Sequence, residues 1–362
     1  MKQISVMIKP ASSLCNMRCA YCFYRDAASM RNMPSHGLMS NETASAVLRN
    51  IFSDISHKDL VTIAFQGGEP TLAGLEFYEK FVSKAKSIAS GVRISFAFQT
   101  NGLAIDDNWC LFFKKHKFLV GLSMDLIDHN TNRVDPEGKG TWNRVLKTKS
   151  LLDRHKVEYN VLCVLTNELA RYPSRVWKAI EQLGIKFVQF IPCLNKFDEN
   201  IKAGLTPHRF AGFYNGIIPL WYENFIAGKY FSIKLVDDFV NLLARKIVGA
   251  CGLTGECSQQ FVVEADGSVY PCDFYALDEF CIGSFCESSL STLYKNDASR
   301  VFMQMKNVYE MCKKCRFAPI CGGGCKRMKN NVFVCDDSDF CGYQDVLSKN
   351  WEIFSAVASY NI

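Results

Sequence analysis

Short apolar runs rich in β-branched and aromatic residues alternate with amphipathic stretches over about the first 230 residues. The runs that read as strands are 4–9, 61–65, 93–98, 119–123, 158–165 and 186–191. Helical patterns lie between them, at about 41–55, 75–90, 106–116, 141–155 and 173–183. Such alternation predicts an α/β fold with a parallel sheet and crossover helices. Six repeats are too few for an eightfold barrel, so we expect an open, partial (β/α)6 TIM-like barrel.

A polar or glycine-containing segment follows each predicted strand. Three cysteines follow the first strand, QGGEP the second, QTNG the third and SMD the fourth, while LTNE and PCLN follow the last two. The carboxyl ends of parallel strands meet at one edge of a sheet, which is where the chemistry of such folds lies. We therefore expect these segments to converge.

The composition of the sequence changes after the predicted barrel. A helical connector precedes residue 250, and more than half of the cysteines follow it. Within that region FVVEADGSVYPCD reads as a hairpin around Asp-Gly. We expect a second domain that metal clusters hold together more than an apolar core does. The predicted organisation is a barrel at 1–230, a connector at 231–249, a cysteine-rich domain at 250–345 and a C-terminal helix at 346–362.

The cysteine content limits the compartment and the role of these thiols. There are 17 cysteines, an odd number, and they are clustered. The N-terminus lacks a signal-peptide core, and no stretch approaches about 18 consecutive apolar residues. We expect a cytoplasmic protein without a membrane partner, whose cysteines bind metal clusters instead of forming disulfides.

The net charge of +6 assumes neutral thiols. Eleven thiolates around three clusters with core charges of about +2 would bring the total to roughly +1. The sequence also lacks a lysine/arginine block or an aromatic RNA-binding pattern. Nucleic acid is therefore not an expected partner.

Cys15, Cys19 and Cys22 have no fourth ligand nearby in the sequence. Three thiolates can hold three irons of a 4Fe–4S cube and leave the fourth iron open for a ligand. The alternative is half of a zinc site that a distant cysteine completes. The spacing C-x3-C-x2-C resembles the signature of the radical S-adenosylmethionine (SAM) superfamily. There the open iron binds SAM, and one electron cleaves SAM to methionine and a 5′-deoxyadenosyl radical.

QGGEP supports this interpretation by its position after the second strand. In the superfamily a glycine-rich stretch there meets the SAM amino group. Gly67 and Gly68 would let the backbone approach the ligand, and Glu69 can accept a hydrogen bond from the ammonium.

A closer resemblance covers residues 5 to about 345. IKPASSLCNMRCAYCFY, AFQGGEPTLAGLEFYEKF, QTNG, FLVGLSMD, CSQQFVVEADGSVYPCDFY and CKKCRFAPICGGGCKR together resemble the anaerobic sulfatase-maturating enzymes. The resemblance implies a radical SAM domain and a C-terminal SPASM domain with two auxiliary 4Fe–4S clusters, so three clusters in all. It also implies oxidation of a sulfatase cysteine or serine, in a Cys/Ser-x-Pro-x-Arg motif, to Cα-formylglycine. An electron donor such as ferredoxin or flavodoxin is the implied second partner.

The resemblance assigns roles residue by residue. Cys15, Cys19 and Cys22 would hold the SAM cluster. The positions matching SAM contacts are Tyr21, Gly68, Ser123, Arg133 and Leu194. Arg133 also has a physical rationale, because a guanidinium pairs with a carboxylate. The segment SMDLIDHNTNR departs from the family, so which arginine or asparagine meets SAM stays open.

The SPASM pattern assigns two sets of four thiolates. The first auxiliary cluster would use Cys251, Cys257, Cys272 and Cys325, and the second Cys312, Cys315, Cys321 and Cys341. Cys335 is the rival of Cys341 as last ligand. The run at 312–325 is also compatible with a zinc ribbon. Six cysteines stay unassigned, and we expect most of them to be buried thiols.

Asp273 directly follows a predicted cluster ligand and matches the proton acceptor of the family. The oxidation removes a hydrogen atom from the substrate Cβ and a proton from its thiol or hydroxyl, and a carboxylate beside the pocket can take that proton. Gln66, Tyr24 and Tyr275 are candidates for lining the peptide pocket.

Two other functions stay open at this point. One is a SPASM maturase that forms thioether or other crosslinks in a ribosomal peptide, although we expect no leader-binding domain here. The other is a non-enzymatic iron–sulfur or zinc protein, which would need neither QGGEP nor a six-strand scaffold.

Overall fold

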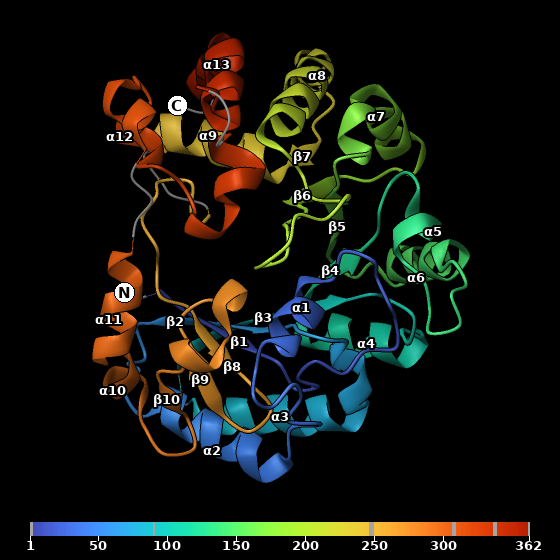
Figure 1. Ribbon diagram of the computed structural model, residues 1–362. Coiled ribbons are helices and arrows are strands. Elements are labelled where there is room, and N and C mark those ends of the chain that lie inside the picture. The colour runs from blue at the N-terminus through green and yellow to red at the C-terminus, as the bar shows by residue number, and fades with distance from the viewer. Residues whose placement is uncertain (1–2, 90, 246–249, 306–308, 336–338, 361–362) are drawn as a thin grey trace. The chain divides into compact units, whose positions relative to one another are not determined.

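The computed structural model describes residues 3–89, 91–245, 250–305, 309–335 and 339–360 (Figure 1). Contacts divide the chain into two compact units. The first comprises Met1–Ser123, Asn130–Tyr159 and Gln259–Met303, and the second comprises Met124–His129, Asn160–Ser258 and Gln304–Ile362.

The first unit is built on strands in the order β10-β9-β8-β1-β2-β3-β4. Their bounds are β1 Gln3–Ile8, β2 Leu60–Phe65, β3 Arg93–Thr100, β4 Leu119–Ser123, β8 Phe261–Val263, β9 Ser268–Tyr270 and β10 Gly283–Ser284. From β8 to β4 all neighbours are parallel, whereas β9 and β10 are antiparallel. The carboxyl ends of β1, β2, β3 and β8 therefore meet at one edge.

Helices accompany these strands, most of them in the crossovers between parallel strands. They are α1 Phe23–Ser29, α2 Asn41–Phe52, α3 Leu75–Ile88, α4 Asp107–His116, α5 His129–Asn132, α6 Trp142–His155, α10 Leu290–Tyr294 and α11 Asp297–Gln304. Helices α2, α3 and α4 lie along one face of the sheet (Figure 1). Side-chain caps fix where two of them begin: Ser40 accepts from Thr43 N and Asp106 from Trp109 N.

An aromatic core fixes β2 and β3 against α3 and α4. Phe65, Tyr78 and Phe98 are buried, and their ring centroids lie 5.0 Å apart for Phe65–Tyr78 and for Tyr78–Phe98. Phe113 adds a contact at 5.1 Å to Phe98. Burying each such ring contributes about 1.5–3 kcal/mol. This packing gives the loops after β2 and β3 a rigid base.

The second unit contains β5 Tyr159–Leu165, β6 Phe187–Pro192 and β7 Ser232–Ile233, and β6 pairs in parallel with both β5 and β7. Its helices are α7 Pro173–Gln182, α8 Pro207–Ile226, α9 Lys234–Arg245, α12 Ala318–Cys321 and α13 Gly342–Tyr360. A polar link joins α8 to α13, because Asn215 Nδ2 donates to Asp345 Oδ2 at 2.6 Å.

The six predicted strands correspond to β1–β6, and the five predicted helices to α2, α3, α4, α6 and α7. Strand β3 runs two residues further than predicted, because Gln99 and Thr100 still pair with β4. The predicted hairpin is present as β8 and β9. The domain boundaries at 230, 249 and 345 stay predictions.

The expectation that metal clusters, more than an apolar core, hold the cysteine-rich region together stays a prediction, but the hairpin of this region has apolar packing of its own. Residues 259–303 are not poor in apolar packing, because β8 extends the sheet beside β1 and Phe261, Val262, Val263 and Phe285 are buried. The periodicity shows that a hairpin forms but not which strand it joins, because strand pairing over such a distance leaves no local signal.

Among the described residues, no helix is both long and apolar enough to span a bilayer.

Candidate functional site

The loop between β1 and α1 carries Cys15, Cys19 and Cys22. Backbone hydrogen bonds tie this loop to a second segment: Arg18 N donates to Val134 O at 2.8 Å and Ala20 N to Asn132 O at 2.9 Å. Burial raises the pKa of the Cys15 thiol to about 12, and negative charge on Cys19 and Cys22 adds to this effect. The three cysteines share this one loop, although among the described residues no three Cys, His, Asp or Glu side chains are already gathered as a metal-binding group. A cationic iron–sulfur cube is the kind of group that fits such a donor set.

The QGGEP turn lies directly against the cysteine loop. Gly68 has a φ of +47°, and a Cβ there would lie 2.2 Å from Leu14 O. The next residue fixes the same contact, because Glu69 N donates to Leu14 O at 2.8 Å. Only glycine fits at position 68, so the turn supports the peptide that precedes Cys15.

Glu69 joins three segments from a buried position. Its Oε1 accepts from Thr71 N at 3.0 Å and from the hydroxyls of Thr71 and Thr100 at 2.8 Å, and its Oε2 accepts from Asn101 N at 2.7 Å. Burial raises its pKa, while these hydrogen bonds oppose that shift. Asn101 in turn donates to Asn16 Oδ1 at 2.8 Å and to Cys15 Sγ at 3.9 Å. The structure therefore gives Glu69 a scaffolding role, whereas contact with the SAM ammonium stays a prediction.

Two of the predicted SAM contacts lie together beside the cysteines. The Arg133 guanidinium lies over the Tyr21 ring, with its Cζ 5.5 Å from the ring centroid. Ser123 ends β4 and is largely buried. Leu194 is buried in the second unit, after β6. That Arg133 adjoins the cysteine loop favours it for a role at SAM, which stays a prediction for all four residues.

Asp273 lies in a hydrogen-bonded group with two of the residues proposed for the peptide pocket. Tyr24 OH donates to Asp273 Oδ2 at 2.7 Å, and Gln66 Nε2 donates to the same oxygen at 3.2 Å and also to Tyr24 OH. Burial, and then the Asp273 charge, raise the pKa of Tyr24, which keeps its hydroxyl protonated as a donor. Tyr275 is not part of this hydrogen-bonded group. Its ring packs on the rings of Phe280 and Phe302, with centroids 5.4 Å apart in both pairs.

Sequence reasoning missed the charged residues on the other side of Asp273. Lys9 Nζ lies 3.1 Å from Asp273 Oδ1 and 3.6 Å from Glu264 Oε1. In the structure Lys9 and Glu264 stand directly after β1 and β8, but the sequence prediction included Lys9 in the first strand, so no local signal marked this pair.

The four cysteines predicted for the second auxiliary cluster all lie in the second unit, but their side chains are not gathered into a metal-binding group among the described residues. Burial raises the pKa of Cys321 to about 11, and the charges of Cys341, Cys312 and Cys315 raise it further. The pKa of Cys341 is raised by burial and by Cys312 and Cys315. Cys335 is linked to this region by a backbone bond, Cys335 N to Phe340 O at 3.0 Å. Val334 and Cys341 form an antiparallel bridge, so both rivals lie in the same paired segment and the choice of Cys341 over Cys335 stays a prediction.

Three of the four cysteines predicted for the first auxiliary cluster also adjoin one another in the second unit. A hydrogen bond between Cys251 and Cys257 lowers the pKa of Cys251 to about 6 and raises that of Cys257. A Cβ on Gly252 would lie 2.7 Å from Cys325 Cβ. Cys272 follows β9 in the first unit, so its membership of the set stays a prediction.

The unassigned cysteines fall into two groups. Cys110, Cys163 and Cys193 are buried, whereas Cys281 and Cys286 are exposed and Cys335 is half-buried, so the expectation that most of the six are buried is wrong.

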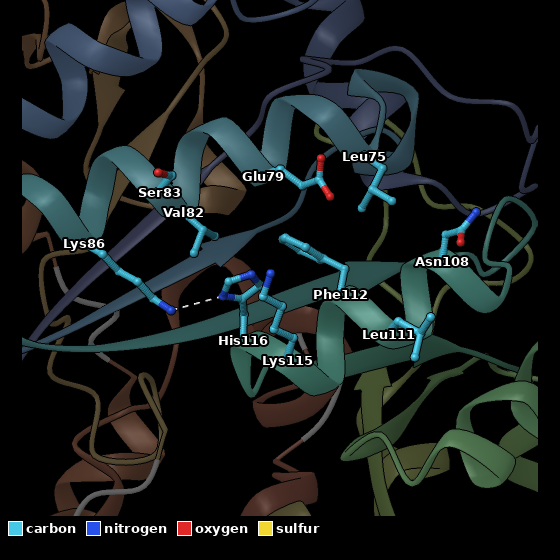
Figure 2. Close-up of a pocket in the computed structure, with 10 residues that line it drawn as sticks. All are labelled: Leu75, Glu79, Val82, Ser83, Lys86, Asn108, Leu111, Phe112, Lys115 and His116. Carbon is cyan, nitrogen blue, oxygen red and sulfur yellow. Dashed lines mark hydrogen bonds between the residues drawn. The ribbon is translucent and has the colours of Figure 1, made fainter.

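A groove of about 610 Å³ lies between α3 and α4, away from these residues (Figure 2). Lys86, Lys115 and His116 give it a basic end, with Lys86 Nζ 3.1 Å from His116 Nδ1. Burial and these two lysines lower the pKa of His116. None of the predicted site residues lines this groove.

Comparison with known proteins identifies the two parts of the chain. Residues 10–170 match the radical SAM superfamily, and residues 251–316 match SPASM, an iron-sulfur cluster-binding domain. The second match favours iron–sulfur clusters over the zinc ribbon.

Relatives match over nearly the whole length. The chain is 36% identical over 368 residues to a cysteine-type anaerobic sulfatase-maturating enzyme of Clostridium novyi, covering 99% of this chain and 98% of that protein. It is 39% identical over 338 residues to such an enzyme of Clostridium perfringens, covering 91% of each.

A solved structure agrees with the fold throughout. The structure of anSMEcpe with bound AdoMet and Cp18Cys peptide matches with a TM-score of 0.91 and 35% identity, covering 100% of both chains. The predicted fold class is confirmed: a partial barrel with a C-terminal SPASM domain. The chain belongs to the anaerobic sulfatase-maturating enzymes, radical SAM proteins that carry a SPASM domain.

Proposed function

We propose that this enzyme oxidises a cysteine, or a serine, in a sulfatase Cys/Ser-x-Pro-x-Arg motif to Cα-formylglycine. The observation that carries the chemistry is the buried Asp273 carboxylate, which is held by Tyr24 and Gln66. Both relatives compared above are cysteine-type enzymes, and anSMEcpe has been solved with a Cp18Cys peptide. This supports cysteine as the preferred residue.

The cofactors would be three 4Fe–4S clusters and SAM. The N-terminal cluster would be held by Cys15, Cys19 and Cys22, and the auxiliary clusters by the sets Cys251, Cys257, Cys272, Cys325 and Cys312, Cys315, Cys321, Cys341. Tyr21, Gly67, Gly68, Glu69, Ser123, Arg133 and Leu194 would form the SAM site. When bound, SAM and the N-terminal cluster would supply the radical that takes the Cβ hydrogen, and an auxiliary cluster would accept the remaining electron.

The chain's own contribution is to hold the base. Asp273 takes the proton of the substrate thiol. Loss of this proton, one hydrogen atom and one electron converts the CH2–SH group to a thioaldehyde, and water then replaces sulfide to give the aldehyde. Tyr24 and Gln66 donate to Oδ2, so they orient the carboxylate before substrate binds.

The remaining partner is an electron donor, for which ferredoxin or flavodoxin is proposed. We place the reaction in the cytoplasm, and we propose neither nucleic acid nor membrane as a partner.

The test is anaerobic incubation with SAM, a reductant and a short peptide containing Cys-x-Pro-x-Arg, followed by mass spectrometry. We expect the mass loss of thiol-to-aldehyde conversion, and faster conversion than for the serine peptide. Loss of only two hydrogens, without loss of sulfur, would instead identify the crosslinking maturase. A protein that does not cleave SAM would contradict the enzymatic function itself.

Iron analysis tests the ligand sets. After anaerobic reconstitution we expect about twelve irons per chain. Replacing Cys15, Cys19 and Cys22 together by alanine should leave about eight, because the two auxiliary sets do not include them. Replacing buried Cys110 by alanine is the control and should leave the iron content unchanged. About four irons in the wild type, or a predominance of zinc, would contradict the assignment.

A further inference from the structure

Four buried charged side chains form a row that ends at Asp273. Arg31 NH1 lies 2.7 Å from Glu264 Oε1, Lys9 Nζ lies 3.6 Å from that same oxygen, and Lys9 Nζ lies 3.1 Å from Asp273 Oδ1. Lys9 is 3% exposed, Glu264 1%, and Arg31 and Asp273 7% each. The row contains two positive and two negative charges and is therefore neutral.

The sheet builds the centre of this row. Ile8 and Val263 are paired in parallel at the ends of β1 and β8, and Lys9 N donates to Val263 O at 2.8 Å. Lys9 and Glu264 are the next residues of these two strands, so the register places them side by side. The short loop that contains η3 (Asp273–Tyr275) follows the β8–β9 hairpin and supplies Asp273.

Glu264 is fixed independently of Lys9. Ser12 Oγ donates to its Oε2 at 2.8 Å, and Arg31 pairs with its Oε1. Burial alone would raise the pKa of Glu264, but the charges of Lys9 and Arg31 outweigh it and lower the pKa. Glu264 is thus a buried, ionised carboxylate. An ammonium in the same surroundings needs such an anion, because an unpaired buried charge is strongly unfavourable.

We propose that Lys9, anchored by Glu264, is the positioning residue that sets the orientation of the Asp273 carboxylate. Lys9 restrains Oδ1, while Tyr24 and Gln66 restrain Oδ2. Oδ1 is buried and accepts no hydrogen bond from a described residue, so Lys9 acts on it as the facing positive charge. This ion pair and the two hydrogen bonds to Oδ2 together favour one orientation of the carboxylate about χ2. The inference rests on the proposed role of Asp273 as proton acceptor, and it gives a function to Lys9 and Glu264.

The test compares Lys9→Met with Lys9→Arg. Lys9→Met removes the ammonium and retains an unbranched side chain, so the Asp273 carboxylate loses one of its restraints. Because a small misplacement of a reacting group can cost about 10²-fold, we expect formylglycine formation to fall by 10- to 100-fold. The fall should be in kcat, with the peptide KM unchanged, while deoxyadenosine formation and iron content persist. Lys9→Arg keeps the charge and should restore part of the lost activity.

A double-mutant cycle distinguishes positioning from general damage. If Lys9 acts through Asp273, Lys9→Met combined with Asp273→Asn should form formylglycine no more slowly than Asp273→Asn alone. Effects that multiply would overturn the proposal. So would a Lys9→Met variant with full iron content and the wild-type ratio of formylglycine to deoxyadenosine.

A charge-balanced variant covers the case in which Lys9→Met does not fold. Lys9→Met/Glu264→Gln removes one charge of each sign and leaves Arg31 and Asp273, so the row stays neutral. It should show the same loss of formylglycine relative to deoxyadenosine, and an unchanged ratio would overturn the proposal. The two proposals fail separately. Full formylglycine formation in Asp273→Asn would rule out Asp273 as the base. Loss of formylglycine in Asp273→Asn with no loss in the Lys9 variants would rule out only the positioning role of Lys9.

Discussion

Asp273→Asn should lower formylglycine formation by about 10²- to 10⁴-fold, the usual contribution of a general base. Asparagine keeps the size and hydrogen-bonding reach of the carboxylate but cannot take a proton at neutral pH. The residues predicted to hold the N-terminal cluster and SAM are not changed. Deoxyadenosine and methionine should therefore still form, with little aldehyde in the peptide. Chromatography of the nucleoside together with mass spectrometry of the peptide measures both products.

Asp278→Asn is the matched control for this change. Asp278 lies in the same segment, but its Oδ2 accepts from Asn32 N at 2.7 Å, and the row that ends at Asp273 does not include it. It should oxidise the peptide as the wild type does. Aldehyde formation at the wild-type rate in Asp273→Asn, with full iron content, would show that the base lies elsewhere.

The barrel strands were predictable because each is a local apolar run and because its crossover helix carries a local amphipathic pattern. Phe65 and Phe98, for example, lie in runs that can be recognised without knowing what packs on them. The position of β8 was not predictable in this way. Its partner β1 lies more than 250 residues earlier in the chain, and an apolar triplet such as FVV fits the edge of many sheets.

In the candidate site, too, the residues in local motifs were predictable and the residues brought together by distant strand pairing were not. Cys15, Gly68 and Asp273 stand in short motifs whose spacing carries chemical meaning. Lys9 and Glu264 do not, because lysine after a strand and glutamate before Asp-Gly read as ordinary exposed charges. Only the pairing of β1 with β8 buries them together and makes each the counter-ion of the other.

The structure also changes what the glycine turn is expected to do. From sequence, Gly68 is a place where the backbone approaches SAM, so that a side chain there would weaken only the binding of SAM. The structure shows backbone of the cysteine loop at that place: a Cβ would lie 2.2 Å from Leu14 O and 3.0 Å from Ser12 O. A backbone carbonyl cannot move aside as a flexible side chain can.

Gly68→Val should therefore abolish SAM cleavage and also reduce the iron content from about twelve towards about eight per chain. The valine would push away the peptide that precedes Cys15 and would also occupy a left-handed conformation that β-branched residues avoid. Iron analysis and deoxyadenosine formation under dithionite measure the two losses.

Gly74→Ala separates the collision with the cysteine loop from the conformational cost of a side chain at positive φ. Gly74 has a φ of +80°, but apart from its two chain neighbours no described residue has an atom within 4 Å of the Cβ position. Because its ψ is 149°, alanine at this position would occupy a region open almost only to glycine, and the variant has this conformational cost, about 1–3 kcal/mol, without the collision. It should keep its iron and its SAM cleavage. If Gly68→Val also keeps all its iron and loses only SAM cleavage, the turn acts on SAM directly, and its support of the Cys15 loop does not matter for cluster binding.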